Sequence, residues 1–112
     1  MSCLFCKIIA GEIPADVVAE NEHTIAFRDV NPQSPTHVLV IPRAHHDNVG
    51  DLAAAAPEVA AALLVDARAV AEAEGFANSY RLVFNTGEEA GQSVFHCHAH
   101  VLAGRNFSWP PG

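Results

Sequence analysis

The sequence predicts an α+β domain in which helices pack on an antiparallel β-sheet. An Ala-rich stretch over residues 53–73 has helical character, and five short segments rich in β-branched or aromatic residues are typical of strands. Most links between those segments have hairpin length, which favours antiparallel pairing. A chain of 112 residues, half of them hydrophobic, suits one core, so we expect a single domain over 1–112 that includes a C-terminal tail, 104–112.

Two helices are expected, one short and one long. The short helix covers residues 3–10 and is stopped by Gly11. The long helix covers residues 53–73, where Pro57 suits the first turn and Gly75 suits the position after the last turn. Its many alanines would let another backbone approach closely.

Five strands are expected around these helices. The segments are residues 17–19, 24–28, 37–41, 80–84 and 95–102. The order along the chain is therefore helix, three strands, long helix and two strands. The Pro-rich segment 31–35 marks a turn between the second and third strands.

The charge balance excludes several classes of partner. Thirteen acidic against six basic residues give a formal net charge of −7, so no basic footprint for a nucleic acid polymer is present. No apolar run approaches the length of a membrane span, and the N-terminus lacks a signal-peptide pattern. Three cysteines, an odd number, argue against a disulfide framework. We expect a cytoplasmic protein with no membrane or nucleic acid partner.

Three of the seven histidines lie within five residues, at His96, His98 and His100. On a strand, alternate side chains point the same way, so the three imidazoles would form a row with neighbours roughly 7 Å apart. Their mutual repulsion would lower at least one pKa and keep neutral nitrogens available. A neutral imidazole is a nucleophile towards phosphorus.

Two other interpretations of this row remain open at the level of the residues. The histidines could be solvated or hydrogen-bonded, although three in alternation beside an apolar face make that a weak alternative. Two histidines at i and i+2 on a strand can also chelate zinc, and a third ligand would complete a catalytic site. The spacing alone favours nucleophile and zinc about equally.

The loop before the histidines favours phosphorus chemistry. It contains Gly91, which permits close backbone approach, and Gln92 and Ser93, which offer side-chain donors. Donors beside a nucleophile can stabilise the charge on phosphoryl oxygens. Alone, this loop would indicate only a surface turn.

These residues, with three further segments and the tail, resemble a known family. Residues 91–102, GQSVFHCHAHVL, resemble the signature of the histidine triad (HIT) superfamily, in which histidines alternate with apolar residues. Segments 5–15, 32–37 and 40–42 are similar to its opening and middle. The ending WPPG, residues 109–112, is similar to the tail of the Hint branch, the purine nucleoside phosphoramidases.

The resemblance implies both a fold and an activity. The fold is the HIT fold, a five-stranded antiparallel sheet with one long and one short helix, extended across a homodimer. The activity is cleavage of the P–N bond in purine nucleoside 5′-phosphoramidates such as AMP-lysine, or cleavage of acyl-nucleotides. It proceeds through a covalent nucleotidyl-histidine and requires no cofactor for chemistry.

The resemblance also assigns catalytic roles. His98 would be the nucleophile, with its other ring nitrogen oriented by a backbone carbonyl. His100 and Ser93 would lie near the phosphate oxygens and the leaving amine. His37 and His96 would complete the histidine cluster.

Further residues would bind the purine nucleotide, AMP or GMP. Asp29 would bind the ribose hydroxyls, with the backbone of Val30 nearby, although an Asp before a turn is by itself a local cap. The phosphate and sugar would be contacted by Asn85, Gly91, Gln92 and Ser93. The apolar base pocket would be formed by Leu4, Phe5, Ile8, Ile13 and Phe27.

The resemblance implies a structural zinc as well. Its ligands would be Cys3, Cys6, His45 and His96, with His46 as a neighbouring alternative to His45. From the residues alone, Cys3 and Cys6 could instead be small apolar residues on a short helix. The homodimer would bring Trp109 to the partner's active site. Two rival functions stay open: a zinc-dependent hydrolase ligated by the three clustered histidines, and a non-catalytic nucleotide-binding regulatory protein.

Overall fold

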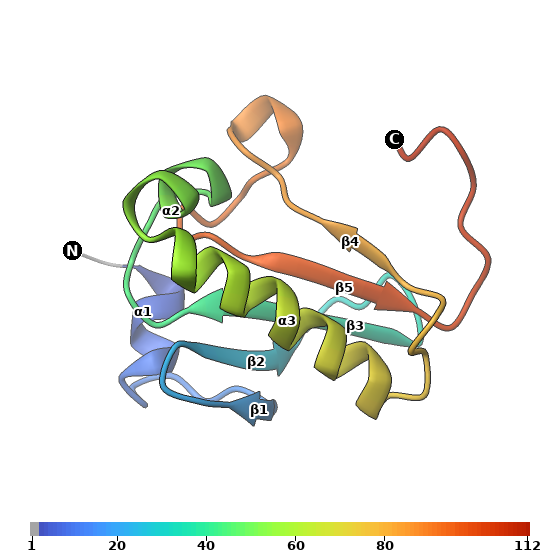
Figure 1. The fold of residues 1–112 in the computed structure, drawn as a ribbon, viewed down its shortest axis with the longest axis horizontal. Coiled ribbons are helices and arrows are strands. Elements are labelled where there is room, and N and C mark those ends of the chain that lie inside the picture. The colour runs from blue at the N-terminus through green and yellow to red at the C-terminus, as the bar shows by residue number, and fades with distance from the viewer. Residues whose placement is uncertain (1–2) are drawn as a thin grey trace.

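A computed structural model describes residues 3–112 and shows one antiparallel sheet with its long helix on one face (Figure 1). The strand order is β1-β2-β3-β5-β4. The strands are β1 Val17–Glu20, β2 Thr24–Arg28, β3 Thr36–Pro42, β4 Arg81–Val83 and β5 Ala99–Ala103. The helices are α1 Leu4–Ile9, α2 Val49–Ala55, α3 Pro57–Ala73 and the 3₁₀-helix η1 Glu88–Ala90. The predicted α+β class and five-stranded antiparallel sheet are confirmed, whereas the sheet extended across a homodimer stays a prediction.

The prediction of one unbroken helix over 53–73 is wrong at its beginning. Residues 53–55 end a separate helix, α2, which the Asn48 side chain caps by accepting a hydrogen bond from the amide of Asp51 at 2.9 Å. The non-helical backbone of Ala56 separates α2 from α3, which begins at Pro57. The cause is Pro57, since a proline disfavours helical backbone in the residue before it. The structure therefore has two short α-helices rather than one.

The prediction of a last strand over 95–102 is also wrong at its beginning, because β5 starts only at Ala99. His96 and His98 therefore lie in an irregular segment rather than on a strand. That segment is held to the loop before α2 by a hydrogen bond from the Cys97 amide to the carbonyl of His46 at 2.7 Å. The predicted row of three histidines on one strand does not exist.

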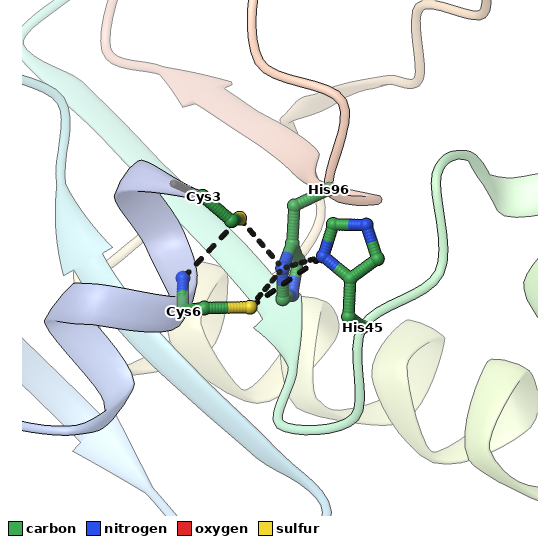
Figure 2. A group of neighbouring side chains, drawn as sticks. All are labelled: Cys3, Cys6, His45 and His96. Carbon is green, nitrogen blue, oxygen red and sulfur yellow. Dashed lines mark hydrogen bonds between the residues drawn. The ribbon is translucent and has the colours of Figure 1, made fainter. Parts of the chain in front are cut away.

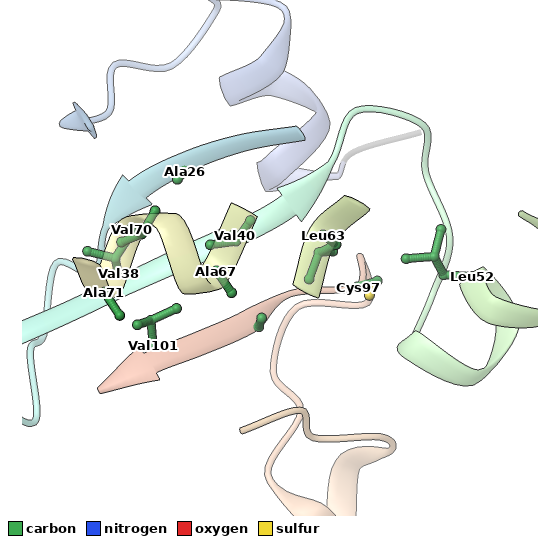
Figure 3. Packing of buried hydrophobic residues seen from close by; sticks show 11 residues of the cluster. Ala26, Val38, Val40, Leu52, Leu63, Ala67, Val70, Ala71, Cys97 and Val101 are labelled. Carbon is green, nitrogen blue, oxygen red and sulfur yellow. The ribbon is translucent and has the colours of Figure 1, made fainter. Parts of the chain in front are cut away.

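The main core lies between the sheet and α3 (Figure 3). Ala67 and Ala71 are fully buried, which lets the helix backbone approach Val38 and Val101 closely. Cys97 is buried in the same core. Along β3, alternate residues therefore point towards α3.

The other face of the sheet is divided between a small core and a polar surface. On this face of β3, Leu39 and Ile41 join Phe27 and Phe5 of α1. Beyond them, towards β5, the same face carries the clustered histidines. Within residues 3–112, no helix combines the length and the apolar composition that crossing a membrane requires.

Candidate functional site: two histidine clusters that share His96

The side chain of His98 is held by the backbone of a neighbouring histidine. Its Nδ1 lies 2.8 Å from the carbonyl oxygen of His96, and the side chain is buried. A carbonyl can only accept a hydrogen bond, so Nδ1 must carry the hydrogen of the neutral ring. The lone pair of His98 is consequently on Nε2, the nitrogen that would attack an electrophile.

A chain of hydrogen bonds fixes the neighbouring ring in the opposite tautomer. The amide of Gln33 donates to Nδ1 of His37 at 3.0 Å, so the hydrogen of neutral His37 is on Nε2. That nitrogen lies 2.9 Å from Nδ1 of His100 and 3.4 Å from a carboxylate oxygen of Asp29. His100 therefore accepts at Nδ1 and presents its own hydrogen at Nε2.

Burial favours the neutral form of His37, His96 and His100 by lowering the pKa of each ring. It lowers the pKa of His100 to about 4, with smaller contributions from the charges of His98 and His37. Burial is also the main cause that lowers the pKa of His37 and of His96. At least one histidine pKa is lowered, as the sequence predicted, but desolvation outweighs mutual repulsion. With their rings 4.9 Å apart, His98 and His100 can supply a lone pair and an N–H donor together.

These two histidines line a cavity of about 510 Å³. Much of its wall is apolar and includes Leu4, Phe5, Ile8 and Phe27. Phe5 also contacts His98 edge-to-face, with ring centroids 5.2 Å apart. The polar part of the lining includes Asp29, Ser93, His98 and His100.

Asp29 caps a turn and also lies in the cavity wall. One carboxylate oxygen accepts from the amide of Asn31 at 2.8 Å, as a turn cap does. The other oxygen is the one near His37, and the residue lines the cavity together with fully exposed Val30. A local cap and a place in the site are therefore compatible.

The loop residues lie mostly behind the cavity rather than in its wall. The side chain of Gln92 is buried, accepts from the Gly87 amide at 2.9 Å and donates to the Asp47 carbonyl at 2.6 Å. Gly91 has a positive φ of 98°, and the side chain of Asn85 packs 3.8 Å from the position a Cβ would take there. Of the predicted phosphate-binding residues, Ser93 alone is part of the cavity lining.

Sequence reasoning also missed part of the cavity. Ile13 is not among the lining residues, whereas Pro14, Ala15, Asp16, Arg28, Leu39 and Val94 are. Leu39 could have been found by alternation, because it lies two residues after His37 on the same face of β3. The others belong to segments brought in by tertiary packing.

A second cluster joins α1 to the same part of the chain. Figure 2 shows Cys3 and Cys6 on or beside α1, facing His45 and His96. Nδ1 of His96 lies 3.5 Å from the Cys3 sulfur, 3.6 Å from the Cys6 sulfur and 3.2 Å from Nδ1 of His45. His46 is outside this group.

The tautomers of the two histidines fit a cation at the centre of this cluster. His96 donates from Nε2 to the carbonyl of Pro42 at 2.8 Å, and His45 donates from Nε2 to Asp47 at 3.0 Å. In the neutral rings, each Nδ1 atom therefore carries a lone pair. The two Nδ1 atoms lie close to each other and to the sulfurs of Cys3 and Cys6. Zinc bonds of 2.0–2.3 Å in a tetrahedron place ligand atoms about 3.3–3.8 Å apart. The spacing and the Cys₂His₂ donor set fit zinc, with Pro42 and Asp47 orienting the ligands.

The geometry does not support a metal site built from the three clustered histidines. Among the described residues, the groups of possible ligands that converge are Cys3, Cys6, His45 and His96, and separately Asp29, His37 and His100. His98 belongs to neither group, and the contact between His37 and His100 is satisfied by a hydrogen bond. The arrangement instead defines a class of protein in which a histidine hydrogen-bonded at Nδ1, His98, lies in the wall of a cavity lined largely by apolar residues.

Comparisons with known proteins give this class a family. The HIT domain model matches residues 10–107. A crystal structure of a HIT family hydrolase from Legionella pneumophila has a TM-score of 0.94 and 49% identity, and the match covers 99% of this chain and 100% of that chain. The chain therefore belongs to the HIT family.

Two plant relatives carry more specific names. A "14 kDa zinc-binding protein" of Zea mays is 48% identical over 97% of this chain and 87% of its own length. An "Adenylylsulfatase HINT1" of Arabidopsis thaliana is 43% identical over 97% of this chain and 76% of its own length.

Proposed function

We propose that this HIT protein is a nucleotide hydrolase that cleaves the P–N bond of purine nucleoside 5′-phosphoramidates, or the corresponding bond of acyl-nucleotides, through a nucleotidyl group on His98. The observation that carries the proposal is the opposite tautomers of two adjacent rings. His98 presents a lone pair at Nε2, and His100 presents a hydrogen at Nε2. A nucleophile and a donor side by side are what attack on a phosphoryl group requires.

The reaction would proceed in two displacements at one phosphorus atom. Nε2 of His98 first forms a bond to the α-phosphorus, the P–N bond breaks, and the amine leaves with a proton taken up from solvent. Water then attacks the same phosphorus and gives up a proton to solvent, the bond from phosphorus to Nε2 breaks, and the nucleoside monophosphate is released with neutral His98 restored. The N–H of His100 would stabilise charge on the phosphoryl oxygens or the leaving group in both steps.

The cavity suits a nucleoside monophosphate in one orientation. Its apolar wall, with Phe5 and Phe27, would take the base, and Asp29 would accept hydrogen bonds from the ribose hydroxyls. Ser93 would then face the phosphate. Gln92 would act by holding the loop in place, because its amide is already bonded to backbone groups.

We also propose that Cys3, Cys6, His45 and His96 hold a structural zinc ion. The matching donor spacing and the zinc-binding relative from Zea mays support this assignment. The ion would tie α1, which forms part of the cavity wall, to the segment that positions His98. It would contribute stability and no step of the chemistry, because four protein ligands leave no open position. The homodimer, the role of Trp109 and the cytoplasmic location stay predictions.

One experiment separates the proposed function from its two rivals. The protein is incubated with adenosine 5′-phosphoramidate, with and without a chelator, quenched, and analysed by mass spectrometry for AMP and for an adenylyl group on His98. We expect turnover in both samples and an adduct on the peptide that contains His98. Activity that requires added metal would indicate a zinc hydrolase, and binding without product would indicate a regulatory protein.

A further inference from the structure

The two cysteines at the start of α1 are placed to react with each other. Cys3 directly precedes the first turn of the helix, and its sulfur accepts a hydrogen bond from the amide of Cys6 at 3.4 Å. The two sulfurs belong to a group in which all the ligand atoms lie within 4.8 Å of one another (Figure 2). A disulfide joins its sulfurs at roughly 2.05 Å, so the two thiols need to approach further. The backbone of Cys3 is extended and lies outside the helix, which allows this approach without unwinding α1.

One side of this cysteine cluster is open to solvent. The side chain of His45 is 37% exposed, and its contact with the sulfur of Cys6 lies on the exposed side. Cys3 and Cys6 are half-buried, whereas Cys97 is buried in the main core. Oxidation of a cysteine requires access to its sulfur. A small oxidant can therefore reach the first two thiols and not the third.

The helix that begins at the two thiols also forms part of the cavity wall. Leu4 and Phe5, which lie between the cysteines in the sequence, both line the cavity. The ring of Phe5 contacts that of His98 edge-to-face. A disulfide would close a ring over residues 3–6 and so shift the backbone that holds Leu4 and Phe5. Because α1 packs on β2 and β3 through Phe5, this connection does not depend on which edge of the sheet a second copy would cover.

Two hydrogen-bonded paths connect the same cluster to the candidate active site. Nδ1 of His96 lies 3.5 and 3.6 Å from the two sulfurs, while the backbone carbonyl of His96 accepts from His98. His45 donates to the carboxylate of Asp47, and the backbone carbonyl of Asp47 accepts from Gln92 in the loop before the clustered histidines. A change at the sulfurs can therefore reach both the segment of the proposed nucleophile and this loop.

We propose that Cys3 and Cys6 are a redox modification site, at which a peroxide converts the dithiol into a disulfide, releases the metal and lowers the activity. The disulfide rests on the contacts of the two thiols, whereas the loss of zinc and of activity rests on the proposed function. Cysteine binds zinc as the thiolate, so the disulfide would leave the imidazoles of His45 and His96 as the remaining protein ligands of the cluster. The dithiol would thus make the rate of nucleotide hydrolysis depend on the oxidation state of the surroundings.

The modification transfers two electrons from the sulfurs to one molecule of hydrogen peroxide. The thiolate of Cys6, on the more open side, attacks one peroxide oxygen, the O–O bond breaks, and a sulfenic acid and a hydroxide ion form. The thiolate of Cys3 then attacks the sulfur of Cys6, the S–S bond forms, the S–O bond breaks, and a second hydroxide ion leaves. Both hydroxide ions take up a proton from solvent and become water. A dithiol reductant reverses the reaction by thiol–disulfide exchange.

The test treats the zinc-loaded protein with a small molar excess of hydrogen peroxide. Digestion after Lys7 gives the peptide 1–7, which contains both cysteines, and its mass without reduction reveals a disulfide by the loss of two hydrogen atoms. We expect this disulfide and the release of about one equivalent of zinc. We also expect kcat/KM for adenosine 5′-phosphoramidate to fall about 10–100-fold, as the loss of an outer-shell contact does. Dithiothreitol together with zinc should reverse all three changes.

Two variants serve as matched controls. Cys97→Ala keeps the dithiol and removes the buried thiol, so it should respond to peroxide as wild type does. Cys6→Ala leaves Cys3 without a partner, so the reversible loss of kcat/KM should disappear. If Cys97→Ala does not fold, as judged by circular dichroism, Cys97→Val replaces it, because valine keeps an apolar side chain at this place in the core.

Two results would overturn the modification site and leave the proposed function intact. The first is a peptide 1–7 that keeps both thiols free, or that gains oxygen at the sulfurs without forming a disulfide. The second is a disulfide that leaves bound zinc and kcat/KM unchanged. If the reduced protein cleaves no phosphoramidate, the proposed function fails, and the effect of the disulfide is read from the ring ¹⁵N signals of His98. A shift on oxidation that dithiothreitol reverses would support the site, and unchanged signals would reject it.

Discussion

The two histidine clusters use the same side chain in opposite ways. In the cluster of Cys3, Cys6, His45 and His96, backbone and carboxylate oxygens take the Nε2 hydrogens and turn the lone pairs inwards towards one point. At His98, a carbonyl takes the Nδ1 hydrogen, and the lone pair is free for a ligand in the cavity. The acceptor bonded to each ring therefore determines which nitrogen carries the lone pair. It decides, more than the spacing of the histidines does, whether the ring is suited to bind a metal or to attack an electrophile.

His96 connects the two clusters. Its ring belongs to the cysteine cluster, while its carbonyl orients His98. A metal that fixes the ring of His96 would therefore also fix the carbonyl that is hydrogen-bonded to His98, the proposed nucleophile. Variants at either cluster, and at the hydrogen bonds that orient the rings, test this difference between the two clusters.

The largest effect is expected from His98→Asn. Without the lone pair at Nε2, turnover of adenosine 5′-phosphoramidate should fall by at least about 10⁴-fold, as happens when a nucleophile is removed. AMP binding, measured by calorimetry, should stay within a few-fold of wild type because the cavity is preserved. A variant that keeps wild-type turnover would contradict the assignment of the nucleophile.

The next largest effect concerns the metal cluster. His45→Ala should reduce bound zinc in freshly purified protein from near one equivalent to below a tenth, and should lower the free energy of unfolding by about 2–3 kcal/mol. His46→Ala is the matched control, because His46 lies outside the converging ligands. Equal zinc contents in the two variants would reject the ligand set.

A smaller effect is expected when the tautomer of His100 is released. His37→Ala removes the donor that bonds to Nδ1 of His100 at 2.9 Å, so the ring can place its hydrogen on either nitrogen. We expect kcat to fall about 10–100-fold, less than the roughly 10²–10³-fold loss caused by removing such a donor outright, while the adenylyl group still forms on His98. An unchanged kcat would show that the hydrogen-bond chain does not govern catalysis.

The smallest effect concerns the pH dependence of stability. The pKa of His100 is lowered by burial from 6.5 to about 4, so below pH 6.5 the unfolded chain binds a proton that the folded chain does not. Stability is therefore lost as the pH falls from 6.5 towards 4, by about 2 kcal/mol between pH 7 and pH 5. Denaturant unfolding of His100→Gln at these two pH values should show a decrease smaller by that amount. The same decrease in both proteins would contradict a neutral, half-buried His100.

The elements of the fold were predictable where local signals were strong, and their ends were not. Pro57 marks the start of α3, but the break it forces at Ala56 also creates α2, which an Ala-rich pattern hides. The start of β5 depends on pairing with β3, a tertiary property that alternation in the sequence does not contain.

The site was predictable as a set of residue types rather than as a geometry. The three clustered histidines identified the region, yet their division between two clusters depends on acceptors distant in sequence, such as the carbonyl of Pro42. Likewise, Cys3 meets His96 across 93 residues of chain. The side chain of Gln92 is of a type that can bind phosphate, so the sequence favoured that role. Its hydrogen bonds to the backbone, which occupy the side chain, exist only in the folded loop.

The most direct test of the central claim is to observe the four tautomers. Long-range ¹H–¹⁵N spectra of the ring nitrogens, recorded above pH 7 and assigned with single His→Gln variants, distinguish Nδ1–H from Nε2–H in each neutral histidine. The account predicts Nδ1–H for His98 and Nε2–H for His37, His96 and His100. An Nε2–H form of His98 would place its lone pair against a carbonyl and contradict its role as the nucleophile.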